Sequence, residues 1–221
     1  MRIAILTGQI GSKGTIKDPS NGGFSSADYY AFTDKDLDVR VWKTKAAYHF
    51  SSQPDFQQRR DAKLPKVLGW LLVPGYDYYI WHDSGCEVSQ DPTEVVQTYL
   101  QHNTDIALWQ HPDRDCSYAE CDAVAGYSME TATNVAITRQ FLAEQNWPPH
   151  SGLFEMSSFV YRNSPRVQAA MLSWWEMICR YSSRDQILWP LVVKKHQLNF
   201  SIMPGRAQAY AGNNQIIPQV R

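Results

Sequence analysis

The stretch Tyr78-Tyr79-Ile80-Trp81-His82-Asp83-Ser84-Gly85 passes from an unbroken apolar, aromatic run into a polar turn. The run from Ile3 to Leu6, which Thr7 and Gly8 follow, has the same form. Short continuous apolar runs that end at turn residues are typical of strands buried on both faces of a parallel sheet. Further strands are expected at 29–32, 39–42, 106–109, 159–161 and 198–202.

Helix signals lie between these runs. Pro65 suits the first position of a helix, Asp91 before Pro92 suits a cap, and Ser164-Pro165 begins a long apolar-faced helix. Helices are also expected over 130–144 and over 183–195, the latter capped by Ser183. Because strands and helices alternate, the sequence predicts a three-layer α/β domain with a mostly parallel central sheet. We expect the chain to form a single domain over 1–221, in which 206–221 is a polar tail.

Composition and charge favour some classes of protein over others. Hydrophobic residues make up 43% and charged residues 19% of the 221 positions, which is typical of a globular chain. With a net charge of -1 the chain lacks a basic field for a nucleic-acid partner. The four cysteines form no Cys-x-x-Cys pair, which indicates reduced thiols. The first apolar run is too short for a signal peptide and no stretch is long enough to span a bilayer, so we expect a cytoplasmic protein.

The polar residues that follow the predicted strands are the first candidates for a site, because ligands of open α/β sheets bind outside the carboxyl ends of strands. They are Thr7, Asp34, Asp83 and His111. Asp83 is equally compatible with a divalent-cation ligand and with a turn-forming aspartate. Motifs for dinucleotides, for P-loop nucleotides, for serine hydrolases and for zinc proteases do not occur in the sequence.

Three further groups carry charge suited to chemistry. Arg60 and Lys63 lie three residues apart and share one face if the segment is helical; they either neutralise a diphosphate leaving group or form a solvated basic face. Arg184 and Asp185 either cap a helix with a surface ion pair or present a carboxylate to an acceptor hydroxyl. His196 stands alone, which favours a structural role, although a late histidine can complete a metal site.

Six blocks in order resemble a known family: Phe32-Thr33-Asp34, 59–66, 76–83, His111-Pro112-Asp113-Arg114, Trp174-Trp175-Glu176 and Ser183-Arg184-Asp185-Gln186. Together they are similar to the glycosyltransferase-like domain of plant mucilage-related, TOD-type proteins. This domain also occurs in bacteria, and some plant members carry the label alkaline ceramidase. The family is similar to nucleotide-sugar transferases of the GT-A type.

The resemblance implies a nucleotide-sugar-binding half over about 1–110 and an acceptor half over about 111–205. Thr7 and Asp34 would lie near the base and ribose, while Arg60 and Lys63 would face the donor. Asp83 would take the place of the metal-binding Asp-x-Asp signature, although Ser84 and Gly85 follow it here. His111 and Arg184 join the candidates for donor binding, and Glu155 and Asp185 would line the sugar and acceptor region.

The expected function is transfer of a hexose-type sugar from a nucleotide sugar, such as a UDP-sugar, to a glycan or other hydroxyl acceptor. Asp185, and after it Glu155, are the expected catalytic carboxylates. Manganese or magnesium would bind Asp83, with His196, water and the diphosphate completing the shell. The alternative is a non-catalytic domain that binds a nucleotide sugar or a glycan, which the incomplete Asp-x-Asp favours; a hydrolase has no motif in its support.

Overall fold

The computed structural model describes residues 1–11, 16–49, 57–86 and 88–206. Almost all of the predicted tail therefore lies outside the described residues. Within the described ranges, no helix is both long enough and apolar enough to cross a membrane.

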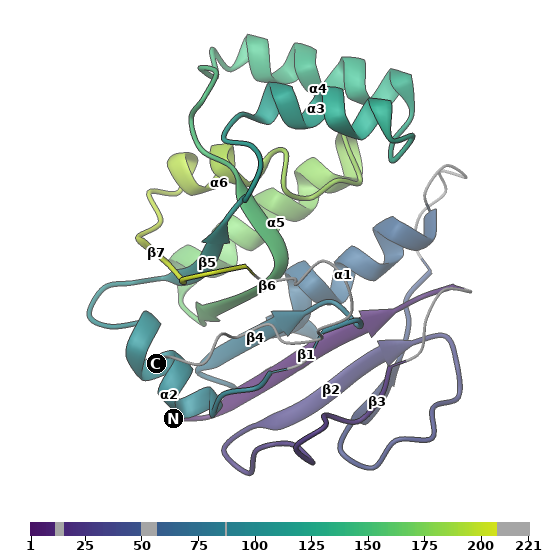
Figure 1. Cartoon of the computed structure of the whole chain (residues 1–221), viewed down its shortest axis with the longest axis vertical. Coiled ribbons are helices and arrows are strands. Elements are labelled where there is room, and N and C mark those ends of the chain that lie inside the picture. Colours follow the sequence, from purple (N-terminus) through teal and green to yellow (C-terminus); the bar gives the residue numbers. More distant parts are fainter. Residues whose placement is uncertain (12–15, 50–56, 87, 207–221) are drawn as a thin grey trace.

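A seven-stranded sheet forms the centre of the described chain, in the order β3-β2-β1-β4-β6-β5-β7 (Figure 1). The strands are β1 (Ile3–Gln9), β2 (Asp28–Thr33), β3 (Lys43–Ala46), β4 (Tyr78–His82), β5 (Ile106–Gln110), β6 (Phe154–Arg162) and β7 (Phe200–Ile202). β6 runs antiparallel to its neighbours β4 and β5, and the remaining paired strands are parallel. The prediction of a mostly parallel sheet is confirmed, and strands from both predicted halves join it.

Six helices lie in the described ranges: α1 (Gln57–Leu72), α2 (Pro92–Tyr99), α3 (Ser117–Gly126), α4 (Ala132–Glu144), α5 (Pro165–Arg180) and α6 (Trp189–Lys195). One face of the sheet packs against α1, α5 and α6, with α3 and α4 side by side beyond them (Figure 1). The other face is covered by α2 and connecting loops. The predicted three-layer arrangement is therefore confirmed.

Alternate residues of each strand enter the two cores, because successive side chains of a strand point to opposite faces. Leu6, Trp81 and Phe159 face the α1 and α5 side, whereas Ile5, Ile80 and Val160 face the α2 side. All of them are buried. Continuous apolar runs, rather than alternating ones, follow from this burial on both faces.

The prediction of a strand at 39–42 is wrong, since the strand is the next segment, β3. β3 is an edge strand whose four residues are all exposed, so it carries no apolar run. Trp42 instead packs edge-on against Tyr29 and donates its indole N–H to the Lys17 carbonyl. The apolar run thus belongs to a loop that covers the second face of the sheet.

Of the helix starts predicted at Pro65, at Asp91 and at Ser164, two are confirmed and one differs. Asp91 and Ser164 do cap α2 and α5, accepting hydrogen bonds from Thr93 N and Val167 N. Pro65, however, lies inside α1 rather than at its start, and the helix has a kink with non-helical geometry at Leu68. Proline inside a helix removes the hydrogen bond to the carbonyl four residues earlier, so Pro65 disturbs the turn before it and does not account for the break at Leu68.

Gly69 allows α1 to lie close against the sheet. A Cβ added at this residue would lie 2.1 Å from Cδ1 of Leu6, which is buried in β1. Gly69→Ala is therefore expected to lower the free energy of unfolding by about 1–3 kcal/mol, because overpacking outweighs the better helix propensity of alanine. Urea denaturation measures this change.

Gly126→Ala is the matched control, since Gly126 is also helical and a Cβ there meets nothing within 4 Å. It should leave stability unchanged or raise it by up to about 1 kcal/mol. Equal stability of both variants would show that α1 does not depend on this close approach.

Candidate active site

A cavity of about 180 Å³ lies at the edge of the sheet where β4 and β5 end. Because β6 is antiparallel to both, its first residues reach the same edge, where His82 pairs with Ser158 and Gln110 with Phe154. This is the edge at which open α/β sheets bind their ligands. The charged and polar lining comes from separate segments: Lys63, Lys66, Asp83, His111, Asp113, Arg114, Glu120, Glu155, Ser157, Arg184, Asp185 and Gln186.

The cavity brings together most of the residues predicted from the sequence, namely Lys63, Asp83, His111, Glu155, Arg184 and Asp185. Thr7 is fully buried within β1 and does not line it. Asp34 lines a separate, open hollow at the ends of β2 and β3, where its carboxylate accepts a hydrogen bond from Gly11 N at 3.0 Å. Two hollows therefore lie at the carboxyl ends of the parallel strands.

Two lysines of the cavity lining, one half-buried and one buried, share one carboxylate. Lys63 and Lys66 lie on the same face of α1, and their ammonium groups are 2.9 and 2.6 Å from Oδ2 of Asp185. Lys66 is 1% exposed and Asp185 is 4% exposed. The predicted basic face of this helix is thus turned inward and is not solvated.

Burial and attraction oppose each other in this group. Burial alone would raise the pKa of Asp185, but Lys63 and Lys66 hold that pKa well below its usual range. Burial lowers the pKa of Lys63 to about 8. Burial also disfavours the charge of Lys66, yet Asp185 and Asp83 outweigh it and raise the pKa of Lys66. Asp185 is consequently a stable anion and a weak proton acceptor near neutral pH.

Asp83 follows β4 and is held by its neighbours. Its amide donates to the Ser157 carbonyl at 2.8 Å, and its Oδ1 accepts from the Trp81 indole at 2.9 Å. The same Oδ1 lies 3.5 Å from the Lys66 ammonium. The Asp83 side chain is 44% exposed, so one edge of this oriented carboxylate is open toward the cavity.

The residues around Asp83 do not match a divalent-cation shell, which needs several oxygen ligands. The described part of the chain holds no group of three or more His, Cys, Asp and Glu residues placed for a metal. Lys66 sits against the carboxylates of Asp83 and Asp185. The expectation that His196 joins Asp83 is corrected: His196 Nε2 lies 2.8 Å from Ser173 Oγ, between α5 and α6, and does not line the cavity.

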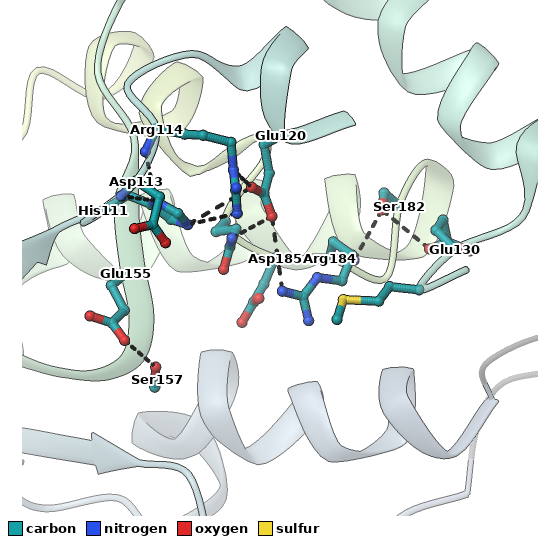
Figure 2. A network of polar contacts seen from close by, with 12 residues as sticks. His111, Asp113, Arg114, Glu120, Glu130, Glu155, Ser157, Ser182, Arg184 and Asp185 are labelled. Carbon is teal, nitrogen blue, oxygen red and sulfur yellow. Dashed lines mark hydrogen bonds and ion pairs between the residues drawn. The ribbon is translucent and has the colours of Figure 1, made fainter. Parts of the chain in front are cut away.

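A second polar group of the cavity lining surrounds Glu120 (Figure 2). Arg114 Nε and Gln186 Nε2 each donate to this carboxylate at 2.5 Å, and Arg184 Nη2 lies 4.0 Å away. Glu120 therefore links the segment after β5 to the loop before α6. Glu120 carries no clear signal in the sequence, because α3 has no capping side chain and buries polar residues along with apolar ones.

His111 belongs to the same group. Its Nδ1 lies 3.2 and 3.1 Å from the amides of Asp113 and Arg114, so it accepts from them and the neutral ring carries its proton on Nε2. Nε2 lies 3.8 Å from Glu120 Oε2. Burial lowers the pKa of His111, which favours the neutral form near pH 7. His111 thus orders the turn after β5 and contributes a polar wall.

Glu130, which the sequence analysis did not select, holds the loop that carries Arg184 and Asp185. Its Oε2 accepts from Ser183 N at 2.6 Å, from Ser183 Oγ at 2.7 Å and from Ser182 Oγ at 3.2 Å. The prediction that Ser183 caps a helix is therefore wrong, since α6 begins only at Trp189. In the sequence, serines followed by polar residues resemble a helix cap. In the structure, the Ser182 and Ser183 hydroxyl groups instead donate to Glu130, which is distant in the sequence.

Arg60 packs beside Glu130 and away from the cavity. It is buried, its Nη2 is 3.9 Å from Glu130 Oε2 and 3.5 Å from the Tyr181 carbonyl, and it does not line the cavity. The predicted donor-facing role is thus corrected to a role in joining α1 to the 181–183 segment. Helix geometry explains the difference, since Arg60 and Lys63 reach different partners from adjacent turns.

The Glu130→Gln variant is expected to lose less free energy of unfolding than the wild type when the pH is lowered. Burial would raise the pKa of Glu130, but its hydrogen bonds outweigh burial and lower it, so the unfolded chain binds more protons in acid. The stabilisation is complete above the unfolded pKa of about 4.3 and is lost as pH falls through the folded value. Urea unfolding between pH 7 and pH 3 measures the difference.

The wild type should lose more stability than Glu130→Gln across that range, by about 1–3 kcal/mol. Glu176→Gln serves as the control, because Glu176 is an exposed partner of Arg180 on α5. It should follow the wild type. Parallel curves for all three proteins would contradict the role of Glu130.

The chain is similar in sequence to a plant protein and in structure to solved glycosyltransferases. The "Probable hexosyltransferase MUCI70" of Arabidopsis thaliana is 22% identical over 171 residues, which cover 73% of this chain and 29% of that protein. The chain thus spans less than a third of the length of this curated relative.

Among solved structures, the apo structure of the WbbM bifunctional glycosyltransferase is similar with a TM-score of 0.51 and 11% identity, covering 90% of this chain and 38% of that one. Mouse xyloside xylosyltransferase 1 in its apo form has a TM-score of 0.49 and 11% identity, covering 91% and 84%. At this identity the WbbM similarity shows the fold alone.

Residues 25–204 match the family described as TOD1/MUCI70, glycosyltransferase-like domain. Since this match spans most of the chain, the chain belongs to the TOD1/MUCI70 glycosyltransferase-like domain family.

Proposed function

We propose that this chain transfers a hexose-type sugar from a nucleotide diphosphate donor to a hydroxyl group of a glycan or another acceptor. Family membership supports glycosyl transfer, and the Arabidopsis relative is by name a probable hexosyltransferase. The observation that carries the proposal is the lysine pair beside Asp83 and Asp185 at the carboxyl end of β4.

The donor is proposed to lie along the carboxyl ends of the parallel strands. The nucleoside would occupy the open hollow at Asp34, and the diphosphate would reach Lys63 and Lys66. The sugar would then lie toward the open edge of the Asp83 carboxylate. Fixed cations beside the departing diphosphate stabilise the charge that develops on it in the transition state.

In the proposed reaction, the bond between the anomeric carbon and the diphosphate oxygen breaks, and the acceptor oxygen forms the new bond to that carbon. The acceptor proton passes to a carboxylate of the cavity. We assign this to Glu155 on β6, because Asp185 is held as an anion by two lysines. Asp185 then acts as the counter-ion that positions both ammonium groups.

The divalent cation and the cytoplasmic location expected from the sequence stay predictions.

Thermal denaturation with a panel of UDP- and GDP-hexoses tests the proposal. A donor present at about 100 times its Kd should stabilise the fold by about 2.7 kcal/mol. Release of the nucleotide diphosphate in the presence of glycan acceptors would then show transfer. If no nucleotide sugar binds or is cleaved, the proposed function fails. A donor that binds yet survives long incubation with many acceptors would favour the non-catalytic alternative.

A further inference from the structure

We propose that Lys66, together with Lys63, supplies the positive charge that holds the donor diphosphate, so that nucleotide binding to this chain needs no divalent cation. This inference rests on the proposed function and deepens it. The sequence predicts a metal at Asp83, whereas the structure places the Lys66 ammonium beside that carboxylate.

The first observation is the position of the Lys66 ammonium. It lies 3.5 Å from Oδ1 of Asp83 and 2.6 Å from Oδ2 of Asp185, so it stands between the two carboxylates nearest to it. A divalent cation bound to Asp83 at the usual distance of about 2.0–2.6 Å would face this ammonium with little shielding between them. The ammonium occupies the Oδ1 side of Asp83, so this oxygen is already engaged and a metal would have only the open edge of the carboxylate.

The second observation is that Lys66 is built into the fold. Its side chain is buried on α1, and its ammonium lies 5.9 Å from the centre of the Trp81 ring. α1 itself is seated on β1 through the close approach of Gly69 to Leu6. Moving this charge away to admit a metal would separate it from the buried Asp185 carboxylate, whereas a diphosphate needs only to approach a charge already in place.

The third observation concerns geometry. Lys63 and Lys66 both lie within 3 Å of one oxygen of Asp185, so their two charges converge on one point at the cavity wall. An ammonium group is a compact charge that binds phosphate oxygens, and two of them suit the adjacent phosphates of a diphosphate. Asp185 keeps both lysines charged and placed before the donor arrives, which supports binding without reorganisation.

The Asp-x-Asp position agrees with this arrangement. Ser84 and Gly85 follow Asp83, so the turn offers one carboxylate where the signature offers two. That carboxylate already accepts from the Trp81 indole and faces Lys66. Its open edge then suits hydroxyl groups of the sugar.

Titration calorimetry with UDP and GDP tests the inference, using the purified chain in EDTA and again in Mn²⁺ or Mg²⁺. The dissociation constant of the bound nucleotide should change by less than about threefold between these buffers. Lys66→Met should weaken binding in EDTA by about 10- to 100-fold, the value of a charged hydrogen bond. Lys66→Arg, which keeps the charge, should retain most of the affinity and guards against a folding defect. Lys194→Met, at an exposed lysine on α6, should bind as the wild type does.

Asp83→Asn separates the two sources of charge. If the lysines hold the diphosphate, this variant should bind UDP or GDP as well as the wild type or more tightly, since it removes a neighbouring negative charge. Binding that requires Mn²⁺ or Mg²⁺ and is lost in Asp83→Asn would overturn the inference and leave the proposed function standing. Absence of any nucleotide or nucleotide-sugar binding, with and without metal, would overturn both.

Discussion

Asp185→Asn is expected to lower the free energy of unfolding by about 3–5 kcal/mol, which is the usual cost of leaving a buried charge without its partner. The ammonium groups of the half-buried Lys63 and the buried Lys66 lie within 3 Å of one Asp185 oxygen, so the substitution leaves both without their shared counter-ion. Asp83 is 3.5 Å from Lys66 and compensates only in part. Urea denaturation at neutral pH, followed by circular dichroism, measures the loss.

Asp113→Asn is the matched control for this substitution. Asp113 also lines the cavity, but its side chain is 55% exposed and its partner Arg206 is at 3.6 Å. An exposed ion pair contributes about 0–1 kcal/mol, so this variant should stay close to the wild type. Adding Lys66→Met to Asp185→Asn should recover part of the stability, because it removes one unpaired ammonium. Similar stability of Asp185→Asn and Asp113→Asn would show that the lysines do not depend on Asp185.

Glu155→Gln is expected to lower kcat by about 10²- to 10⁴-fold while the KM for the donor stays nearly unchanged. The loss of a proton acceptor acts on the chemical step, whereas the lysines that hold the donor are untouched. Figure 2 shows Glu155 on β6, apart from the group around Glu120, with Ser157 donating to its carboxylate at 3.3 Å. Steady-state transfer with an acceptor identified in the screen measures both constants.

Glu144→Gln, at an exposed carboxylate of α4, is the control and should be as active as the wild type. The pH dependence of kcat gives an independent measurement, since the acidic limb of the profile should disappear in Glu155→Gln. Full activity of Glu155→Gln, combined with loss of the acidic limb in Asp185→Asn, would move the proton acceptor to Asp185.

Local sequence was sufficient for most of the fold. Buried strands carry apolar runs because both of their faces are covered, and Asp91 and Ser164 bind the first amides of their own helices. Local sequence was insufficient where a strand is exposed or where a helix buries polar side chains. β3 is an exposed edge strand held by backbone pairing, and α3 buries Ser117 and Glu120 within its inner face. Such elements have no periodic signal in their side chains.

The composition of the site was also partly visible in the sequence, because polar residues that follow buried strands must reach the carboxyl edge of the sheet. Asp83 and His111 follow from this rule alone. The sequence did not distinguish between charged residues of one segment: Lys63 lines the cavity, whereas Arg60 turns to Glu130.

Only the tertiary structure decided which charges meet. Lys66 and Asp185 are more than a hundred residues apart, and they form a 2.6 Å contact because α1 and the loop before α6 pack against the same end of the sheet. Glu130 joins the same loop from a third segment, while His196 turns to Ser173. The sequence alone determined that carboxylates and cations stand near the ends of buried strands. Lys66 lies beside Asp83 because of the way α1 is placed and rotated against the sheet. Long-range packing determines this placement, and the local sequence does not.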